Sequence, residues 1–199
     1  MRRPSTGIHA AILQAATQLF LERGFAGVSM MEVSAFSGGS KQTLYNHFPS
    51  KAGLFAEAML LAAQARPPLP VERLDGEGPL TDRLIDFGQA CLDQTLAAEA
   101  VALRRVLLAD GARAGDGPRL HALYFDAPWQ AVAQRIQIWM ARGQLAAEQP
   151  WEAALTLRGM LEGDSVARCV MGRRVGDTHE AAALATRQFL KAYAPARAA

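Results

Sequence analysis

Apolar residues at helical spacing, separated by short polar or glycine-rich breaks, organise the first third of the chain. From about residue 6 to residue 23 they recur every three or four positions, which predicts an amphipathic helix that Gly24 ends. Ser29 followed by Glu32 has the spacing of a capping box and predicts the start of a second helix. Residues 37–39, Ser-Gly-Gly, end that helix, because glycines accept backbone angles that other residues resist.

A third helix is predicted from Lys41 to about His47, because a serine can cap its start and a proline soon after its end cannot continue it. Its polar side chains are expected to face outward, with Leu44 as the inward anchor. A fourth helix is expected over 51–66, again with a serine cap and a proline stop. Two short helices joined by a glycine-containing turn are typical of a helix-turn-helix.

In the rest of the chain apolar residues also recur at helical spacing, and no stretch shows the alternation typical of a strand. We therefore expect an all-α fold. Residues 67–79, rich in proline and glycine, indicate a loop or domain boundary. Five more helical regions are expected, over about 80–98, 100–112, 119–142 with an interruption at Pro128, 150–171 and 178–194.

Composition narrows the possible functions. Half of the 199 residues are hydrophobic and a fifth are charged, as in globular proteins. The net charge is only +2, but residues 1–66 hold six basic and three acidic side chains, which suits a nucleic-acid partner. No apolar run approaches the roughly 18 residues that span a membrane. We therefore expect a cytoplasmic protein with no membrane partner.

Cysteine and histidine spacing predicts no metal and no cofactor. Cys91 and Cys169 lie far apart and are interpreted as small buried hydrophobes, with a redox pair as the alternative. The four histidines, at positions 9, 47, 121 and 179, form no metal-ligand cluster.

The stretch Gly38–Leu54, G-G-S-K-Q-T-L-Y-N-H-F-P-S-K-A-G-L, resembles the DNA-binding domain of the TetR family of bacterial transcriptional regulators. The family pattern is roughly G-V-S-x-x-T-L-Y-x-H-F-x-x-K-x-x-L, and the resemblance extends back to Ile12. The chain departs from this pattern at Ser34, Gly39 and Gly53. The two glycines would each cost about 1 kcal/mol inside a helix.

This resemblance implies that the third helix enters the major groove of DNA. Lys41, Gln42 and Tyr45 are the candidates to reach base edges. The candidates for phosphate contacts are Ser29, Ser40, Thr43, Asn46, His47 and Lys51. Arg2 and Arg3 are either a solvated tail or an arm that adds phosphate or minor-groove contacts.

Residues 103–163 resemble, less specifically, the C-terminal domain of the AefR-like subgroup, through the runs L-x-x-D-G-A-R, G-Q-L and P-W-E-A-A. The resemblance implies an effector-binding domain whose last two helices pair with those of a second subunit. Candidates to line the effector site are Phe87, Cys91, Phe125, Trp129, Trp139, Met140 and Met160, which suit an apolar or aromatic ligand, unless they are simply core. Candidates for the dimer interface are Leu155, Gly159, Gly163, Val166, Phe189 and Tyr193.

Together these features predict a helix-turn-helix DNA-binding domain over 1–50, a connecting helix over 51–66 and a helical effector-binding and dimerisation domain over 67–199. The favoured function is a homodimeric repressor that a small molecule releases from a palindromic operator on double-stranded DNA. A constitutive regulator and a protein-interaction module are the alternatives. An all-α enzyme is the third, supported only by Asp110, His121 and Asp126 lying near one another in sequence.

Overall fold

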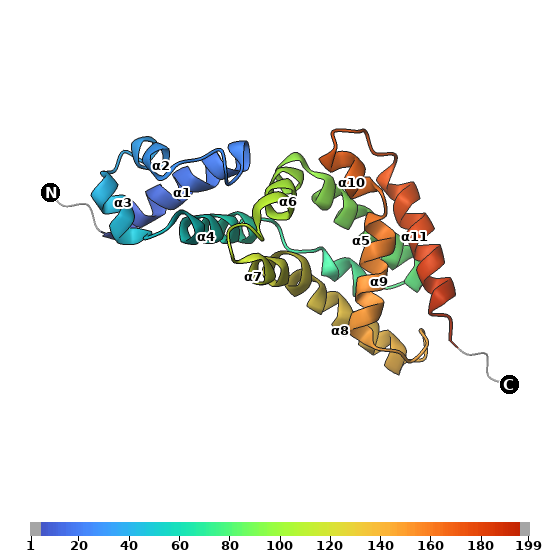
Figure 1. The fold of residues 1–199 in the computed structure, drawn as a ribbon. Helices are drawn as coiled ribbons and strands as arrows, with labels where there is room; N and C mark the ends of the chain where they lie inside the picture. Colours follow the sequence, from blue (N-terminus) through green and yellow to red (C-terminus); the bar gives the residue numbers. More distant parts are fainter. Residues whose placement is uncertain (1–4, 196–199) are drawn as a thin grey trace. The chain divides into compact units, whose positions relative to one another are not determined.

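The computed structural model describes residues 5–195 and is built of helices (Figure 1). No β-strand occurs within that range, which agrees with the predicted all-α class. The chain forms two compact units. Unit 1 comprises the chain up to Arg66 together with Ala102–Phe125, and unit 2 comprises Pro67–Val101 together with the chain from Asp126 onward.

Unit 1 begins with four helices whose positions match the sequence expectation within two residues. They are α1 (Ser5–Arg23), α2 (Met30–Phe36), α3 (Lys41–His47) and α4 (Lys51–Gln64). Serine side chains cap α2, α3 and α4, because each accepts a hydrogen bond from a backbone N–H in the first turn. In Figure 1 α4 lies beside α1, and the two helices are in contact.

The core of unit 1 is completed by residues far along the chain. Segment 102–125 contains most of α6 (Ala98–Asp110), all of α7 (Gly117–His121) and most of the π-helical turn η2 (Ala122–Asp126). Its buried residues, Leu103, Val106, Leu107, Ala114, Leu120 and Tyr124, join the same apolar cluster as Phe20, Leu44, Phe48 and Phe55. The sequence pattern placed all of 67–199 in one domain, whereas segment 102–125 packs with the first four helices.

Unit 2 is a separate helical bundle with an aromatic core. Its remaining elements are the 3-10 helix η1 (Val71–Leu74), α5 (Leu80–Leu96), α8 (Ala127–Ala141), α9 (Pro150–Glu162), α10 (Ser165–Val170) and α11 (Thr178–Ala192). Helix α5 approaches its neighbours closely at Gly88, where an added Cβ would lie 2.7 Å from Leu161 Cδ2 and 3.1 Å from the Ala182 Cβ.

The structure corrects the helix predicted over 150–171 and shows the form of the interruption predicted near Pro128. The helix expected over 150–171 is broken, because Gly163 has a φ of 44° and separates α9 from α10. The interruption expected near Pro128 is the π-helical turn η2, which ends two residues before that proline. Between residues 5 and 195, no helix is both long and apolar enough to cross a bilayer.

Candidate nucleic-acid interface

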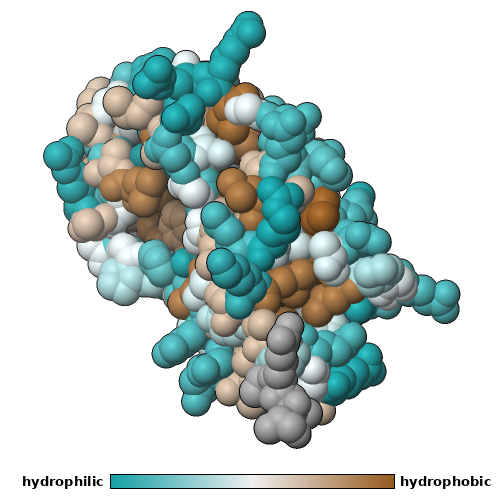
Figure 2. Space-filling model, turned by 90° about the vertical axis from the view of Figure 1, so that its right-hand side faces the viewer, coloured by the Kyte–Doolittle hydropathy of each residue, from teal (hydrophilic) through white to brown (hydrophobic). Residues whose placement is uncertain are grey.

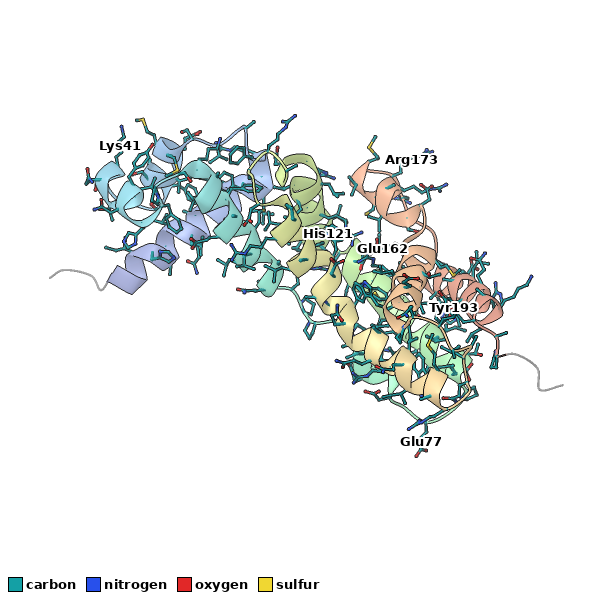
Figure 3. All side chains as sticks on the ribbon, turned by 60° about the horizontal axis from the view of Figure 1, so that its bottom comes forward. Lys41, Glu77, His121, Glu162, Arg173 and Tyr193 are labelled. Atoms are coloured by element: carbon teal, nitrogen blue, oxygen red, sulfur yellow. The ribbon has the colours of Figure 1, made fainter. Side chains whose placement is uncertain are left out.

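Helix α3 has one side buried in the core of unit 1 and an opposite, polar side exposed to solvent. Leu44 and Phe48 are 1% and 2% exposed and anchor the helix in the core of unit 1. On its outer side lie four exposed residues, Lys41, Gln42, Tyr45 and Asn46, which we call the reading face. Figure 3 shows the Lys41 side chain projecting away from the ribbon of α3. The reading face carries donors and acceptors and no carboxylate, as contact with phosphates and base edges requires.

Local hydrogen bonds fix the orientation of α3. Ser40 Oγ accepts the backbone N–H of Thr43 at 3.1 Å, and the two hydroxyls lie 2.8 Å apart. Gln42 Nε2 donates to Asn46 Oδ1 at 2.9 Å along the reading face. Thr43 and His47, both predicted phosphate contacts, are half-buried at the sides of the helix.

A groove of about 540 Å³ runs between the reading face and the start of α2. Of the nine predicted DNA-contact residues, four line this groove: Ser29, Lys41, Tyr45 and Lys51. The other five lie outside its lining: Ser40, Gln42, Thr43, Asn46 and His47. The other lining residues are Ala26, Gly27, Val28, Met30, Met31 and Glu32. Met31 was not among the predicted contact residues, because its 68% exposure at the start of α2 is visible only in three dimensions.

The groove contains a carboxylate, Glu32, which is held in the predicted capping box. Ser29 Oγ accepts the N–H of Glu32, and Glu32 Oε2 accepts the N–H of Ser29 at 2.8 Å. Arg23 Nη1 lies 3.2 Å from Glu32 Oε1. Hydrogen bonding to Ser29, aided by the charges of Arg23 and Lys51, lowers the pKa of the Glu32 carboxyl below its ordinary value. The carboxyl therefore stays ionised, and Arg23 beside it offsets part of its negative charge.

Two of the departures from the TetR pattern contact one another. Ser34 Oγ donates to the Gly39 carbonyl at 3.0 Å, and the Gly39 N–H donates to the Ser34 carbonyl at 3.1 Å. Gly39 lies in the turn before α3, so the helical cost that the sequence suggested for it does not arise. Gly53 is within α4, where that cost remains.

The predicted effector-site residues are divided between the two units. Phe87, Cys91, Trp129 and Trp139 are each at most 4% exposed in the core of unit 2, where Phe87 and Trp129 pack edge to face at 6.0 Å. Met140 and Met160 pack against this core. Phe125 belongs to unit 1, where its ring lies 4.6 Å from that of Tyr124.

One of these residues, Trp139, also lines a small cleft of about 160 Å³ in unit 2. Arg83 lies with its guanidinium 5.8 Å from the Trp139 ring centroid. Asp75 and Arg135 form a bidentate pair at 3.1 and 2.7 Å, and this hydrogen bonding lowers the pKa of Asp75 and raises the pKa of Arg135.

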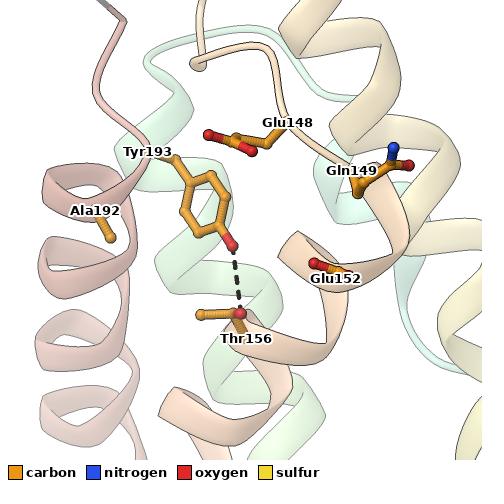
Figure 4. Close-up of a pocket in the computed structure, with 6 residues that line it drawn as sticks. All are labelled: Glu148, Gln149, Glu152, Thr156, Ala192 and Tyr193. Atoms are coloured by element: carbon orange, nitrogen blue, oxygen red, sulfur yellow. Dashed lines mark hydrogen bonds between the residues drawn. The ribbon is translucent and has the colours of Figure 1, made fainter.

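The predicted dimer residues differ in their accessibility. Phe189 is fully buried in the core of its own protomer, so its ring is not a surface feature. Gly159 and Gly163 are exposed, and Leu155 and Val166 are half-buried. Tyr193 lines an open cavity of about 280 Å³ with Glu148 and Glu152, and its hydroxyl is 3.3 Å from Thr156 Oγ1 (Figure 4).

The three residues of the enzyme alternative each have their own partners. Asp110 accepts a hydrogen bond from the backbone of Phe25, the His121 ring stacks on Phe125, and Asp126 pairs with Arg158 at 3.7 Å. Across residues 5–195, no three His, Cys, Asp or Glu side chains group as a metal site. Arg2 and Arg3 lie outside the described residues.

Comparisons with known proteins point to one family. Residues 12–58 match the family model of bacterial regulatory proteins of the tetR family, and residues 82–195 match the AefR-like transcriptional repressor C-terminal domain. The HTH-type transcriptional regulator YdeS of Bacillus subtilis is 38% identical over 110 residues, which are 47% of this chain and 54% of that protein. The chain thus spans about half, or less, of the length of the curated relatives it matches.

Solved structures agree over nearly the whole chain. A TetR-family transcriptional regulator from Mesorhizobium loti is 26% identical with a TM-score of 0.80, covering 97% of this chain and 99% of its own. The flavonoid-responsive regulator FrrA is 28% identical with a TM-score of 0.78, covering 97% and 100%. With more than half of the sequence inside the AefR-like match and the helix-turn-helix in place, the chain belongs to the TetR family of DNA-binding transcriptional regulators, and its C-terminal part is of the AefR-like type.

Proposed function

We propose that this regulator is a repressor that binds a palindromic operator as a homodimer and leaves it when a small apolar or aromatic molecule binds. The observation that carries the proposal is the reading face, which holds four exposed polar residues on a helix anchored by Leu44 and Phe48. In this proposal Lys41, Gln42 and Tyr45 contact base edges, and Ser29 and Lys51, which line the groove with Lys41 and Tyr45, contact phosphates.

A single short helix reads few base pairs, so a dimer is needed to supply affinity and specificity. Two copies related by a two-fold axis would place their α3 helices in successive major grooves, about 34 Å apart. The surface around α9 and α11 suits a second copy: a Cβ added at Gly159 would meet no atom within 4 Å, and Leu184 is 50% exposed. The face turned to the viewer in Figure 2 carries apolar patches among hydrophilic side chains.

The effector is proposed to bind in unit 2, and the aromatic core there supports an aromatic ligand. Phe87, Trp129 and Trp139 form the aromatic part of this core, and Met140 and Met160 pack against it with adaptable side chains. FrrA, which shares this fold at 28% identity, is described as flavonoid-responsive. The ligand would act by population shift, binding best when the two α3 helices are spaced wrongly for the operator.

The first experiment is selection of bound duplexes from a random DNA pool by the purified protein at moderate salt. We expect enrichment of a palindrome whose half-sites are one helical turn, or a multiple of it, apart. Lys41→Ala should weaken the preference by about 1–3 kcal/mol if it reads a base, or reduce the salt slope by about 1 if it contacts a phosphate. Lys191→Ala, on the exposed surface of α11, is the matched charge control.

Release by a ligand is tested on the selected operator by fluorescence anisotropy against a panel of flavonoids and other aromatic compounds. A ligand-responsive repressor is supported if a compound releases the protein from the operator. The compound must act at concentrations that do not change the Lys41-dependent preference for the operator sequence. Binding that no compound in the panel alters would instead favour a constitutive regulator.

A protein-interaction module is the competing candidate, favoured by two exposed apolar residues on α2. Met31 and Phe36 are 68% and 56% exposed, which suits a protein surface more than a phosphate backbone. A folded dimer that enriches no duplex, even at low salt, would overturn DNA recognition and favour this candidate.

A further inference from the structure

Asp110 is a buried carboxylate at the C-terminal end of α6, in segment 102–125 of unit 1. The residue is 7% exposed, and its Oδ2 accepts a hydrogen bond from the backbone N–H of Phe25 at 2.8 Å. This bond joins residues 85 positions apart and ties segment 102–125 to the turn between α1 and α2. Arg113 Nη1 lies 3.9 Å from the other carboxylate oxygen but is largely exposed to solvent.

The turn is shaped to receive this carboxylate. Gly24 ends α1 with a φ of 70°, and its N–H donates to the Phe20 carbonyl at 2.9 Å. A Cβ added at Gly24 would lie 2.9 Å from Asp110 Oδ2, closer than real Cβ contacts. The backbone of the turn and the carboxylate are therefore fitted to each other, and the N–H of Phe25 is aimed at the acceptor.

Phe25 passes this restraint on to the DNA-binding surface. Its ring packs edge to face on Phe55 at 5.2 Å, and Lys51 Nζ lies 4.4 Å from the ring centroid. Lys51 is a candidate phosphate contact, and only three residues separate Phe25 from Ser29, the cap of α2 and another candidate. The position of Phe25 thus affects Lys51 and Ser29, which both line the groove beside the reading face.

We propose that Asp110 is a positioning residue for DNA recognition. Its carboxylate fixes the α1–α2 turn and, through Phe25, holds Lys51 and the start of α2 where they meet the DNA. A bond to an ionised acceptor is roughly twice as strong as one to a neutral acceptor, and removing the acceptor leaves a part-buried N–H without a partner. The role rests on the proposed function, since it presupposes sequence-specific binding.

The test measures the ratio of affinities for the selected operator and for a scrambled duplex, in the full-length protein. Asp110→Ala should lower this ratio by about tenfold, and Asp110→Asn, which keeps an amide oxygen as acceptor, by about threefold. Asp116→Ala removes a more exposed carboxylate of the same segment, which pairs with Arg119 at 3.4 Å, and should leave the ratio unchanged.

The ratio separates positioning from loss of folded protein. Partial unfolding lowers the active fraction and scales both affinities equally, whereas a displaced turn loses specific contacts and keeps the general attraction to phosphates. If Asp110→Ala folds poorly, Asp110→Asn carries the test. Hydrogen exchange at the Phe25 amide should be faster in both variants.

The outcomes distinguish the two proposals. A wild-type protein that selects an operator, combined with an unchanged ratio in both Asp110 variants, would overturn the positioning role alone. A wild-type protein that selects no operator would overturn the proposed function, and the positioning role with it.

Discussion

The reading face and the core of unit 2 use large side chains in opposite ways. On α3, Tyr45 is 40% exposed and stands among polar neighbours, of which Gln42 and Asn46 bond one another. In unit 2, Phe87 is fully buried and meets the Trp129 ring edge to face. The first region turns its side chains toward solvent, and the second turns them into its own interior.

The difference separates binding from stability. A side chain that touches little within the protomer can be removed without unfolding it, so its loss should appear in the affinity for DNA. A side chain surrounded by core leaves a cavity when truncated, so its loss should appear first in the free energy of unfolding. Three substitutions test how sharp this division is.

The largest effect is expected in the core of unit 2. Phe87→Ala should lower the free energy of unfolding by about 3–5 kcal/mol, because it removes a buried ring and leaves a cavity beside Trp129. Urea unfolding followed by circular dichroism measures the loss. Gln188→Ala, on the exposed surface of α11, should stay within about 0.5 kcal/mol of wild type. A Phe87→Ala loss below about 1 kcal/mol would mean that this interior is loosely packed and open to a ligand.

An intermediate effect is expected on the reading face. Tyr45→Ala should weaken operator binding by about 1–3 kcal/mol and change the free energy of unfolding by no more than about 0.5 kcal/mol. Fluorescence anisotropy and urea unfolding give the two numbers on the same preparation. The division fails if stability falls as much as affinity, since Tyr45 would then be part of the core support of α3.

The smallest effect concerns a surface ion pair and its pH dependence. The hydrogen bond from Arg135 lowers the pKa of Asp75 below its usual 3.8, so the folded state holds the charged form more tightly than the unfolded state does. The resulting stability is present above pH 3.8 and is lost as the pH falls through the lower folded pKa. Since the Asp75 side chain is 51% exposed, solvent screens the pair and limits it to about 0.2–1 kcal/mol.

Asp75→Asn should therefore be slightly less stable than wild type at pH 7, with the gap closing at the most acid pH that the fold tolerates. Urea midpoints across that range measure the gap, and operator affinity at pH 7 should be unchanged. A gap that widens on acidification would contradict the assigned direction of the pKa shift.

The local sequence was sufficient to predict α3, which carries the reading face, and its neighbours α2 and α4. Ser29, Ser40 and Ser50 each cap the helix that follows, and their signals lie within three residues of the groups they bond. The same locality explains why the polar side of α3 could be predicted from Leu44 alone. The break at Gly163 was missed because glycine within a helical pattern does not by itself indicate a positive φ.

Contacts between residues far apart in the sequence could not be predicted from such local patterns. Phe189 fits a helical apolar stripe equally well as core or as dimer surface, and only packing places it inside the protomer. The bond from Phe25 to Asp110 joins residues 85 positions apart, and no local pattern indicates it. Likewise, the apolar residues of 102–125 predict a helix without indicating which core it joins.

The discontinuity of unit 1 has a consequence for the order of events on the ribosome. The helix-turn-helix is translated first, but Leu103, Val106 and Tyr124, which complete its core, emerge only with the later segment. At about 5–20 residues per second, the roughly 60 residues between Arg66 and Phe125 take about 3–12 s to add. During that interval the core beneath α3 lacks these residues. We therefore expect the nascent chain to bind DNA only after residues 102–125, which follow the first part of unit 2, have been translated.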